Sequence, residues 1–94
     1  METKPGTIRL TASQKVHLKA CEVYHITVCG NSTGAGNCDF YDGENTNEDL
    51  FLRVQFVQKS SHSISPTVPF ILHKGLYVNL ALNVDSVTII SKPL

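Results

Sequence analysis

The alternation of apolar and polar residues in segment 75–84 constrains the fold more than any other feature of this chain. Leu76, Val78, Leu80, Leu82 and Val84 occupy every second position, and the residues between them are Tyr77, Asn79, Ala81 and Asn83. Successive side chains of a β-strand point to opposite faces, whereas a helix would scatter these apolar residues around its circumference. The pattern therefore predicts a strand with one face on a core and the other in water.

Shorter runs with the same period of two recur along the chain. They cover residues 8–12, 16–18, 24–28, 50–56, 68–72 and 87–90, with a weaker candidate at 39–41. Turn-forming residues separate the runs at 30–37, 42–47, 60–66, 73–75 and 83–86, and the turn at 73–75 is short enough for a hairpin. This spacing indicates an all-β fold, a small antiparallel β-sandwich or barrel of seven to eight short strands, formed as one domain by residues 1–94.

The inward positions of these strands predict the core. The predicted core residues are Ile26, Val28, Leu52, Val54, Phe56, Phe70, Val78, Leu80 and Leu82. A domain of this length hides only about 60–65% of the surface that its unfolded chain would expose. Partner subunits are one common source of the missing stability.

The charge balance excludes several classes of partner. Eight Lys and Arg offset eight Asp and Glu, so there is no overall basic field for nucleic acid, and a net charge near zero favours association. The apolar runs are too short to span a membrane. The first ten residues are polar, so we expect no export signal, synthesis in the cytoplasm, and an extended N-terminal arm at residues 1–6.

The four histidines do not form a recognisable catalytic motif. His17 and His25 fall on the predicted solvent faces of their strands, His62 lies in a Ser-rich loop, and His73 precedes a turn. A nucleophilic site needs a Ser or Cys beside a base that a third group orients, and no signature such as G-x-S-x-G is present. We therefore expect surface histidines, no enzyme activity and no cofactor.

Three cysteines do not make a secreted disulfide framework, because their number is odd. In a reducing cytoplasm we expect free thiols and no disulfide. Cys29 and Cys38 bracket the Gly-rich loop, so they are the pair that could form a bond if the flanking strands were a hairpin. A zinc site with Cys21 lacks the usual C-x₂-C spacing.

The segment 39–49 contains five acidic residues and no Lys or Arg. Calcium takes six to eight oxygen ligands, so Asp42, Glu44 and Asp49 are weak candidates for a metal site, although their spacing differs from that of an EF-hand. The alternative is a solvated loop tip, and we expect no bound metal.

Several residues indicate an interface. Apolar or aromatic side chains fall on predicted outer faces at Phe51, Ile71, Ile90 and Tyr77, where one exposed residue alone would need no explanation. Basic groups concentrate in residues 1–20 and acidic groups in 38–49, so an acidic loop of one copy could meet a basic surface of another. Arg9 and Lys4 are therefore added to the candidate interface residues.

The order of strands and loops resembles a group of small phage virion proteins. The resemblance covers residues 21–91 and rests on the strand 23–28, the loop 30–37, Phe40-Tyr-Asp-Gly43, the strand 50–57, Pro69-Phe70 and Gly75-Leu-Tyr-Val78. It implies a β-sandwich that decorates or cements a capsid, or builds part of a neck or tail, often as a trimer. Cys29 and Cys38 are not part of the pattern that this group shares.

We therefore expect a non-enzymatic virion subunit on the capsid surface, a decoration or head-stabilising protein that binds copies of itself and the major capsid protein or another virion protein. A ligand- or receptor-binding module, lectin-like or at a tail tip, is the alternative, with Tyr24, Tyr41, Tyr77 and the acidic loop supplying contacts. The absence of Trp argues mildly against a sugar-binding platform.

Overall fold

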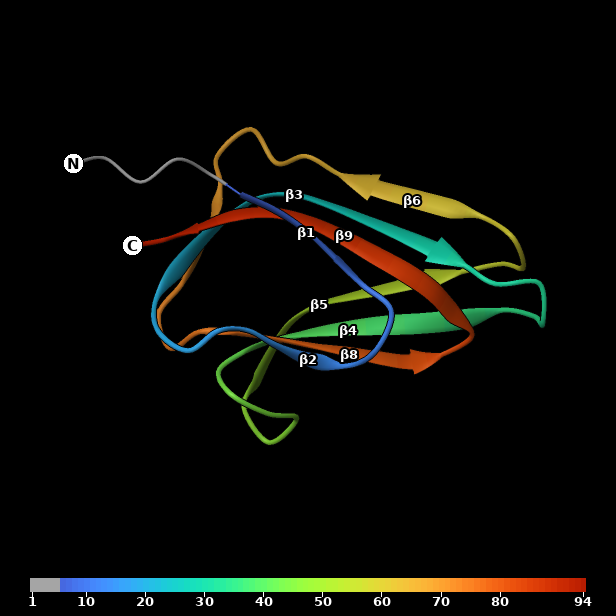
Figure 1. Ribbon diagram of the computed structural model, residues 1–94, viewed down its shortest axis with the longest axis horizontal. Coiled ribbons are helices and arrows are strands. Elements are labelled where there is room, and N and C mark those ends of the chain that lie inside the picture. The colour runs from blue at the N-terminus through green and yellow to red at the C-terminus, as the bar shows by residue number, and fades with distance from the viewer. Residues whose placement is uncertain (1–5) are drawn as a thin grey trace.

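The computed structural model describes residues 6–94, which form nine antiparallel strands and no helix (Figure 1). The strands are β1 (Gly6–Leu10), β2 (Gln14–His17), β3 (Cys21–Gly30), β4 (Gly36–Asp42), β5 (Asp49–Phe56), β6 (Ser61–Ile64), β7 (Phe70–Leu72), β8 (Leu76–Leu82) and β9 (Val84–Pro93). Gly6 begins β1, and the rest of the predicted N-terminal arm lies outside the described residues. Within residues 6–94, no helix is long and apolar enough to cross a membrane.

The strands form two sheets that face each other. Sheet A has the order β1-β9-β3-β6, with β7 also paired to β3, and sheet B has the order β2-β8-β4-β5. The chain therefore resembles a long antiparallel ribbon rolled onto itself: β1 pairs with β9, β2 with β8, β3 with β6 and β7, and β4 with β5. This arrangement is a jelly roll, a form of β-sandwich, so the predicted all-β sandwich is confirmed.

Segment 60–66, which was predicted as a loop, contains β6. Ile64 lies opposite Ile26 of β3, because β3 is ten residues long and extends beyond its pairing with β7. Pro66 and Pro69 have no N–H for a ladder, and they fall between β6 and β7. β6 and β7 therefore occupy the place of one interrupted strand, which explains why nine strands form instead of seven or eight.

The short turn at 73–75 does not make the predicted hairpin. It carries the chain from β7 in sheet A to β8 in sheet B. Gly75 has φ +146°, and a Cβ at this position would lie 2.5 Å from the carbonyl oxygen of His17. This turn therefore requires glycine, both for its backbone conformation and for its close approach to β2.

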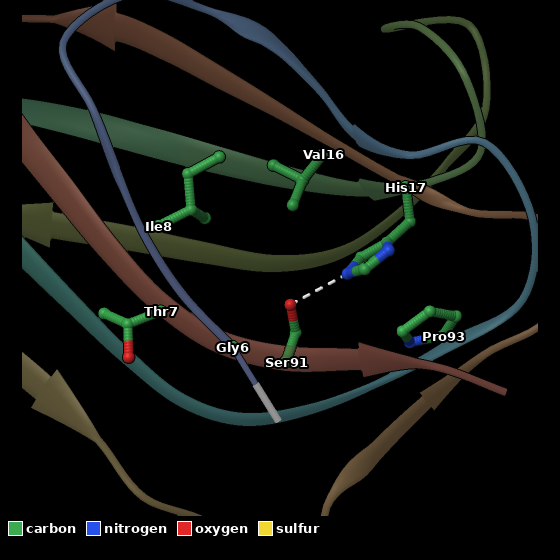
Figure 2. Close-up of a pocket in the computed structure, with 7 residues that line it drawn as sticks. All are labelled: Gly6, Thr7, Ile8, Val16, His17, Ser91 and Pro93. Atoms are coloured by element: carbon green, nitrogen blue, oxygen red, sulfur yellow. Dashed lines mark hydrogen bonds between the residues drawn. The ribbon is translucent and has the colours of Figure 1, made fainter. Parts of the chain in front are cut away.

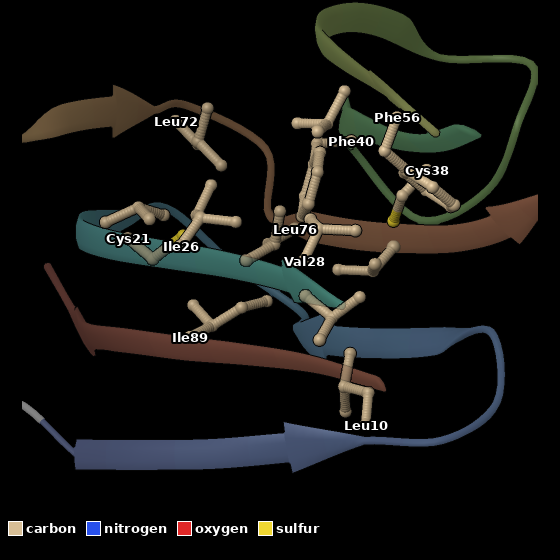
Figure 3. Packing of buried hydrophobic residues seen from close by; sticks show 14 residues of the cluster. Leu10, Cys21, Ile26, Val28, Cys38, Phe40, Phe56, Leu72, Leu76 and Ile89 are labelled. Carbon is tan, nitrogen blue, oxygen red and sulfur yellow. The ribbon is translucent and has the colours of Figure 1, made fainter. Parts of the chain in front are cut away.

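The core lies between the sheets and contains most of the residues predicted for it (Figure 3). Ile26, Val28, Val54, Phe56 and Val78 are buried, and Leu52, Phe70 and Leu80 are partly buried against them. Residues that the prediction did not include complete the core: Leu10, Cys21, Val23, Cys38, Phe40, Leu72, Leu76, Val87 and Ile89.

The prediction that Leu82 is a core residue is wrong, because its side chain is 53% exposed. Leu82 lies opposite Asn37 of β4, and Asn79 lies opposite Asp39, so β8 has one more residue than β4 in this interval. One extra residue in a strand forms a β-bulge and changes which face the following side chains occupy. Strict alternation along β8 is therefore lost before Leu82.

A second bulge changes the faces of β3. Val23 lies opposite Ser91, and His25 lies opposite Ile90, which leaves Tyr24 as the extra residue. Val23 is buried, while Tyr24 is half-buried and its hydroxyl donates a 2.6 Å hydrogen bond to Oε2 of Glu22. Because of this bulge Val23 and Ile26 both face the core, although an odd number of positions separates them.

Candidate functional site

The candidate interface residues do not gather on one surface. Ile71 is 45% exposed in β7 at an edge of sheet A, and Ile90 is half-buried opposite His25. Tyr77 belongs to sheet B, where its ring centroid lies 6.4 Å from that of Tyr41. Arg9 is exposed on β1, 4.0 Å from the carboxylate of Asp85. Lys4 lies outside the described residues.

The prediction that Phe51 faces outward is wrong. Leu52 pairs with Phe40 and Leu50 pairs with Tyr41, so Phe51 is the extra residue of a bulge in β5. The ring of Phe51 contacts the rings of Phe40 and Phe70, with centroid distances of 6.2 and 5.7 Å. Phe51 therefore packs between the two sheets at their edge. Leu50, which is 44% exposed, is the side chain that faces outward.

The outer face of sheet B carries an ordered polar group beside the Tyr41–Tyr77 pair. Asp39 is 3% exposed, and its carboxylate accepts two hydrogen bonds from Arg53, 2.8 Å from Nε and 3.1 Å from Nη2. Asn37 Nδ2 donates a third hydrogen bond of 3.3 Å to the same carboxylate. The hydrogen bond and charge of Asp39 raise the pKa of Arg53, so this guanidinium is fixed over the sheet as a cation.

The outer face of sheet A is lined with hydroxyl groups. The two ring nitrogens of His25 lie 2.5 Å from Ser65 Oγ and 2.7 Å from Thr27 Oγ1, and Thr27 Oγ1 lies 3.2 Å from Ser63 Oγ. His25 is therefore part of a polar network that crosses from β3 toward β6 and is not an isolated surface group.

A pocket of about 290 Å³ lies at the seam between the edge strands β1 and β2 (Figure 2). Ile8, Val16 and Pro93 give it apolar walls, and His17 Nε2 lies 2.8 Å from Ser91 Oγ inside it. A bulge at Val16 turns His17 toward this pocket, so the prediction that His17 faces solvent is wrong. Burial lowers the pKa of His17, which favours the neutral imidazole.

Catalysis by this pair is disfavoured by the position of Ser91. Ser91 is only 5% exposed. It lies on β9 in the middle of sheet A, where it pairs with Gly6 of β1 on one side and with Val23 of β3 on the other. A serine nucleophile must be open to its substrate and close to donors that stabilise an oxyanion. The Ser91 hydroxyl is better placed to satisfy His17 than to attack a substrate.

The carboxylates of the acidic loop bind protein groups. Asp42 accepts hydrogen bonds from the backbone N–H groups of His73 and Lys74, at 3.2 and 2.8 Å. The Lys74 ammonium lies 3.8 Å from Glu48 and 3.9 Å from Asp49. The loop therefore anchors the turn between β7 and β8. Residues 6–94 contain no group of three His, Cys, Asp or Glu side chains that could hold a metal ion.

All three cysteines are free thiols. Cys29 lies on sheet A, where Ser61 Oγ donates a 3.5 Å hydrogen bond to its sulfur, while Cys38 is buried in sheet B. The strands that flank the Gly-rich loop are thus in different sheets and do not form the hairpin that a Cys29–Cys38 bond would need. Burial raises the pKa of Cys21 to about 11 and that of Cys38 to about 12.

A second recess, which the sequence did not indicate, lies at the other seam of the sandwich. It has a volume of about 320 Å³ and is lined by Gln55, Phe56, Val57 and His62. Val57 is 68% exposed beside it. The recess adjoins the end of β5, which is the outermost strand of sheet B.

Comparison of the chain with protein-family models, curated proteins and solved structures finds no match in any of the three.

Proposed function

We propose that this protein is a non-catalytic structural subunit of a phage virion. It associates with copies of itself and docks on the capsid shell, where it acts as a decoration or head-stabilising protein. Its partners are other copies of the chain and the major capsid protein or another virion protein. A neck or tail component is the alternative placement within the virion.

The strand order supports this proposal. Jelly rolls are common in viral capsid proteins and also occur in lectins and cupins, so the fold raises the expectation without deciding it. The phage resemblance of residues 21–91 adds the same expectation from the sequence. A trimer is the assembly that this resemblance implies.

The observation that carries the proposal is the apolar surface left in water by such a small domain. The exposed residues are Leu18, Leu50, Val57, Val68, Ile71, Leu82 and Leu94, with exposed fractions between 44% and 73%. Single exposed apolar residues are ordinary, but seven of them on so small a domain, three within strands and four between or after strands, leave area that a partner can bury. Burial between neighbouring subunits is how a cement protein stabilises a shell, and it needs no active site.

Co-sedimentation with assembled shells that lack the protein tests this proposal. We expect the wild-type chain to pellet with the shells, and we expect Ile71→Asp to bind more weakly because it places a charge at an exposed apolar position of β7. Ser32→Asp, in the exposed loop between β3 and β4, is the matched control and should bind like the wild type. Flanking capsid, portal or terminase genes would agree with the proposal, whereas metabolic neighbours and no shell binding would contradict it.

One observation favours the alternative, a glycan- or receptor-binding module. Tyr41, Tyr77, Asn37 and the Asp39–Arg53 pair share the outer face of sheet B, and aromatic and planar polar groups are typical of ligand surfaces. Binding of the chain to a glycan panel, lost in Tyr77→Ala and retained in Ile71→Asp, would favour this module over the virion subunit.

A further inference from the structure

β5 is the longest strand with an open edge among residues 6–94. It pairs with β4 on one side only and has eight residues, whereas the other edge strands, β1, β2, β6 and β7, have five, four, four and three. An open edge presents a row of unpaired N–H and C=O groups that can pair with another strand.

Three of the four other edge strands of the described sheets carry features that discourage such pairing, and the fourth, β1, has only five residues in all. β2 contains Lys15 and a bulge, and Pro66 and Pro69 interrupt the edge formed by β6 and β7. After the bulge at Phe51, residues 52–56 of β5 run regularly beside β4. Their single charged side chain, Arg53, is already bound to Asp39. Lysine, proline and bulges are among the usual protections of an edge, and residues 52–56 have none of them.

We infer that β5 pairs antiparallel with β5 of a second copy, about a two-fold axis at Val54. This inference rests on the self-association in the proposed function and names the surface that carries it. In this register Leu52 faces Phe56 of the partner copy on the inner face, and Arg53 faces Gln55 on the outer face. Inner side chains thus meet inner side chains, as continuous sheets require.

Other registers are less favourable. An axis between two residues would place inward side chains opposite outward ones. An axis at Arg53 would set two guanidinium groups opposite each other, and like charges across a sheet destabilise it. An axis at Gln55 would carry the ladder past Phe56, where β5 ends. The axis at Val54 avoids all three conflicts.

The ladder of residues 52–56 ends beside an exposed apolar side chain. Val57, which is 68% exposed, follows Phe56 at each end of the paired strands. The recess lined by Gln55, Phe56, Val57 and His62 adjoins this junction. Pairing therefore satisfies the backbone groups of two open edges and brings the partner strand close to an apolar residue that one copy leaves in water.

Charge substitutions at Gln55 test the inference. Gln55→Lys places a lysine opposite Arg53 twice in each dimer, whereas Gln55→Glu places a glutamate there. Because each cross-strand pair occurs twice, the dimer dissociation constant should rise about five-fold in the first variant and fall about five-fold in the second. Both shifts should shrink at high salt. Gln14→Lys and Gln14→Glu, on exposed edge strand β2 of the same sheet, are the matched controls and should leave the constant unchanged.

Sedimentation equilibrium at low salt measures these constants, and a urea titration of each variant establishes that it is folded. Opposite shifts at Gln55 with no shift at Gln14 support β5 pairing. If the chain self-associates but both Gln55 variants match the wild type or shift the same way, β5 pairing is overturned and the proposed function stands. A purely trimeric assembly also overturns it, since this contact is two-fold. A wild-type monomer would contradict the self-association itself.

Discussion

The rings of Phe51 on β5 and Phe70 on β7 meet edge to face, with their centroids 5.7 Å apart. β5 is an edge of sheet B and β7 lies at an edge of sheet A, so this contact closes one seam of the sandwich. Aromatic pairs in this geometry stabilise a structure by about 0.5–1.5 kcal/mol beyond their burial. Phe51 thus belongs to the packing of the monomer and not to its interface.

Phe51→Ala should therefore destabilise the fold. We expect a loss of about 2–4 kcal/mol in the free energy of unfolding, because a partly buried ring and two ring contacts disappear. Ile71→Ala, on the strand that supplies Phe70, is the control and should change it by less than about 1 kcal/mol because its side chain is exposed. Urea titration measures both. An unchanged midpoint in Phe51→Ala would contradict the inward position.

Two leucines of β8 provide a matched test of the bulge in that strand. Leu76 is fully buried and Leu82 is 53% exposed. Leu76→Ala should cost about 2–5 kcal/mol, as deletions of buried leucine do, and Leu82→Ala less than about 1 kcal/mol. Equal losses in thermal or urea unfolding would show that the alternation continues unbroken to Leu82.

The free energy of unfolding should fall on acidification because His17 is held neutral in the folded protein. Its pKa is lowered by burial below the ordinary value of 6.5, so the unfolded chain binds the proton first as the pH falls. The contribution of neutral His17 is complete above the unfolded pKa and is lost as the pH falls through the lower, folded one. Urea midpoints near pH 7.5 and pH 5 measure this loss. His17→Gln should reduce the difference between the two midpoints, and His62→Gln, which changes an exposed ring, should not. An equal difference between the midpoints in all three proteins would contradict the assignment of the pH dependence to His17.

The thiols should react in two classes. Cys29 is partly accessible, while burial and raised pKa values protect Cys21 and Cys38. A thiol reagent should label Cys29 alone in the native protein and all three after unfolding without reductant. One reactive thiol in the unfolded protein would instead indicate a disulfide.

The strands of this fold could be predicted from the sequence because alternation survives in most of them, as the buried Ile26, Val28, Val54 and Val78 show. The predicted faces were wrong where a bulge adds one residue, as at Phe51, since a single extra residue changes which face the positions on one side of it occupy and leaves no mark in composition.

Surface features were predictable only where they depend on alternation within one strand. The exposure of Ile71 was predictable because Ile71 alternates along its strand with Phe70 and Leu72, which are stronger candidates for the core. The meeting of His17 and Ser91 was not, because 73 residues separate them in sequence and a bulge at Val16 turns the ring. The open edge of β5 depends on strand order, which alternation alone does not specify.

Sedimentation equilibrium of the purified wild-type protein at micromolar concentration tests the central claim, that this chain works by association, most directly. We expect a mass above that of the 10.3 kDa chain, rising with concentration toward a discrete oligomer. A monomer across the whole range, with no binding to assembled shells, would contradict the account and leave the ligand-binding module as the better explanation.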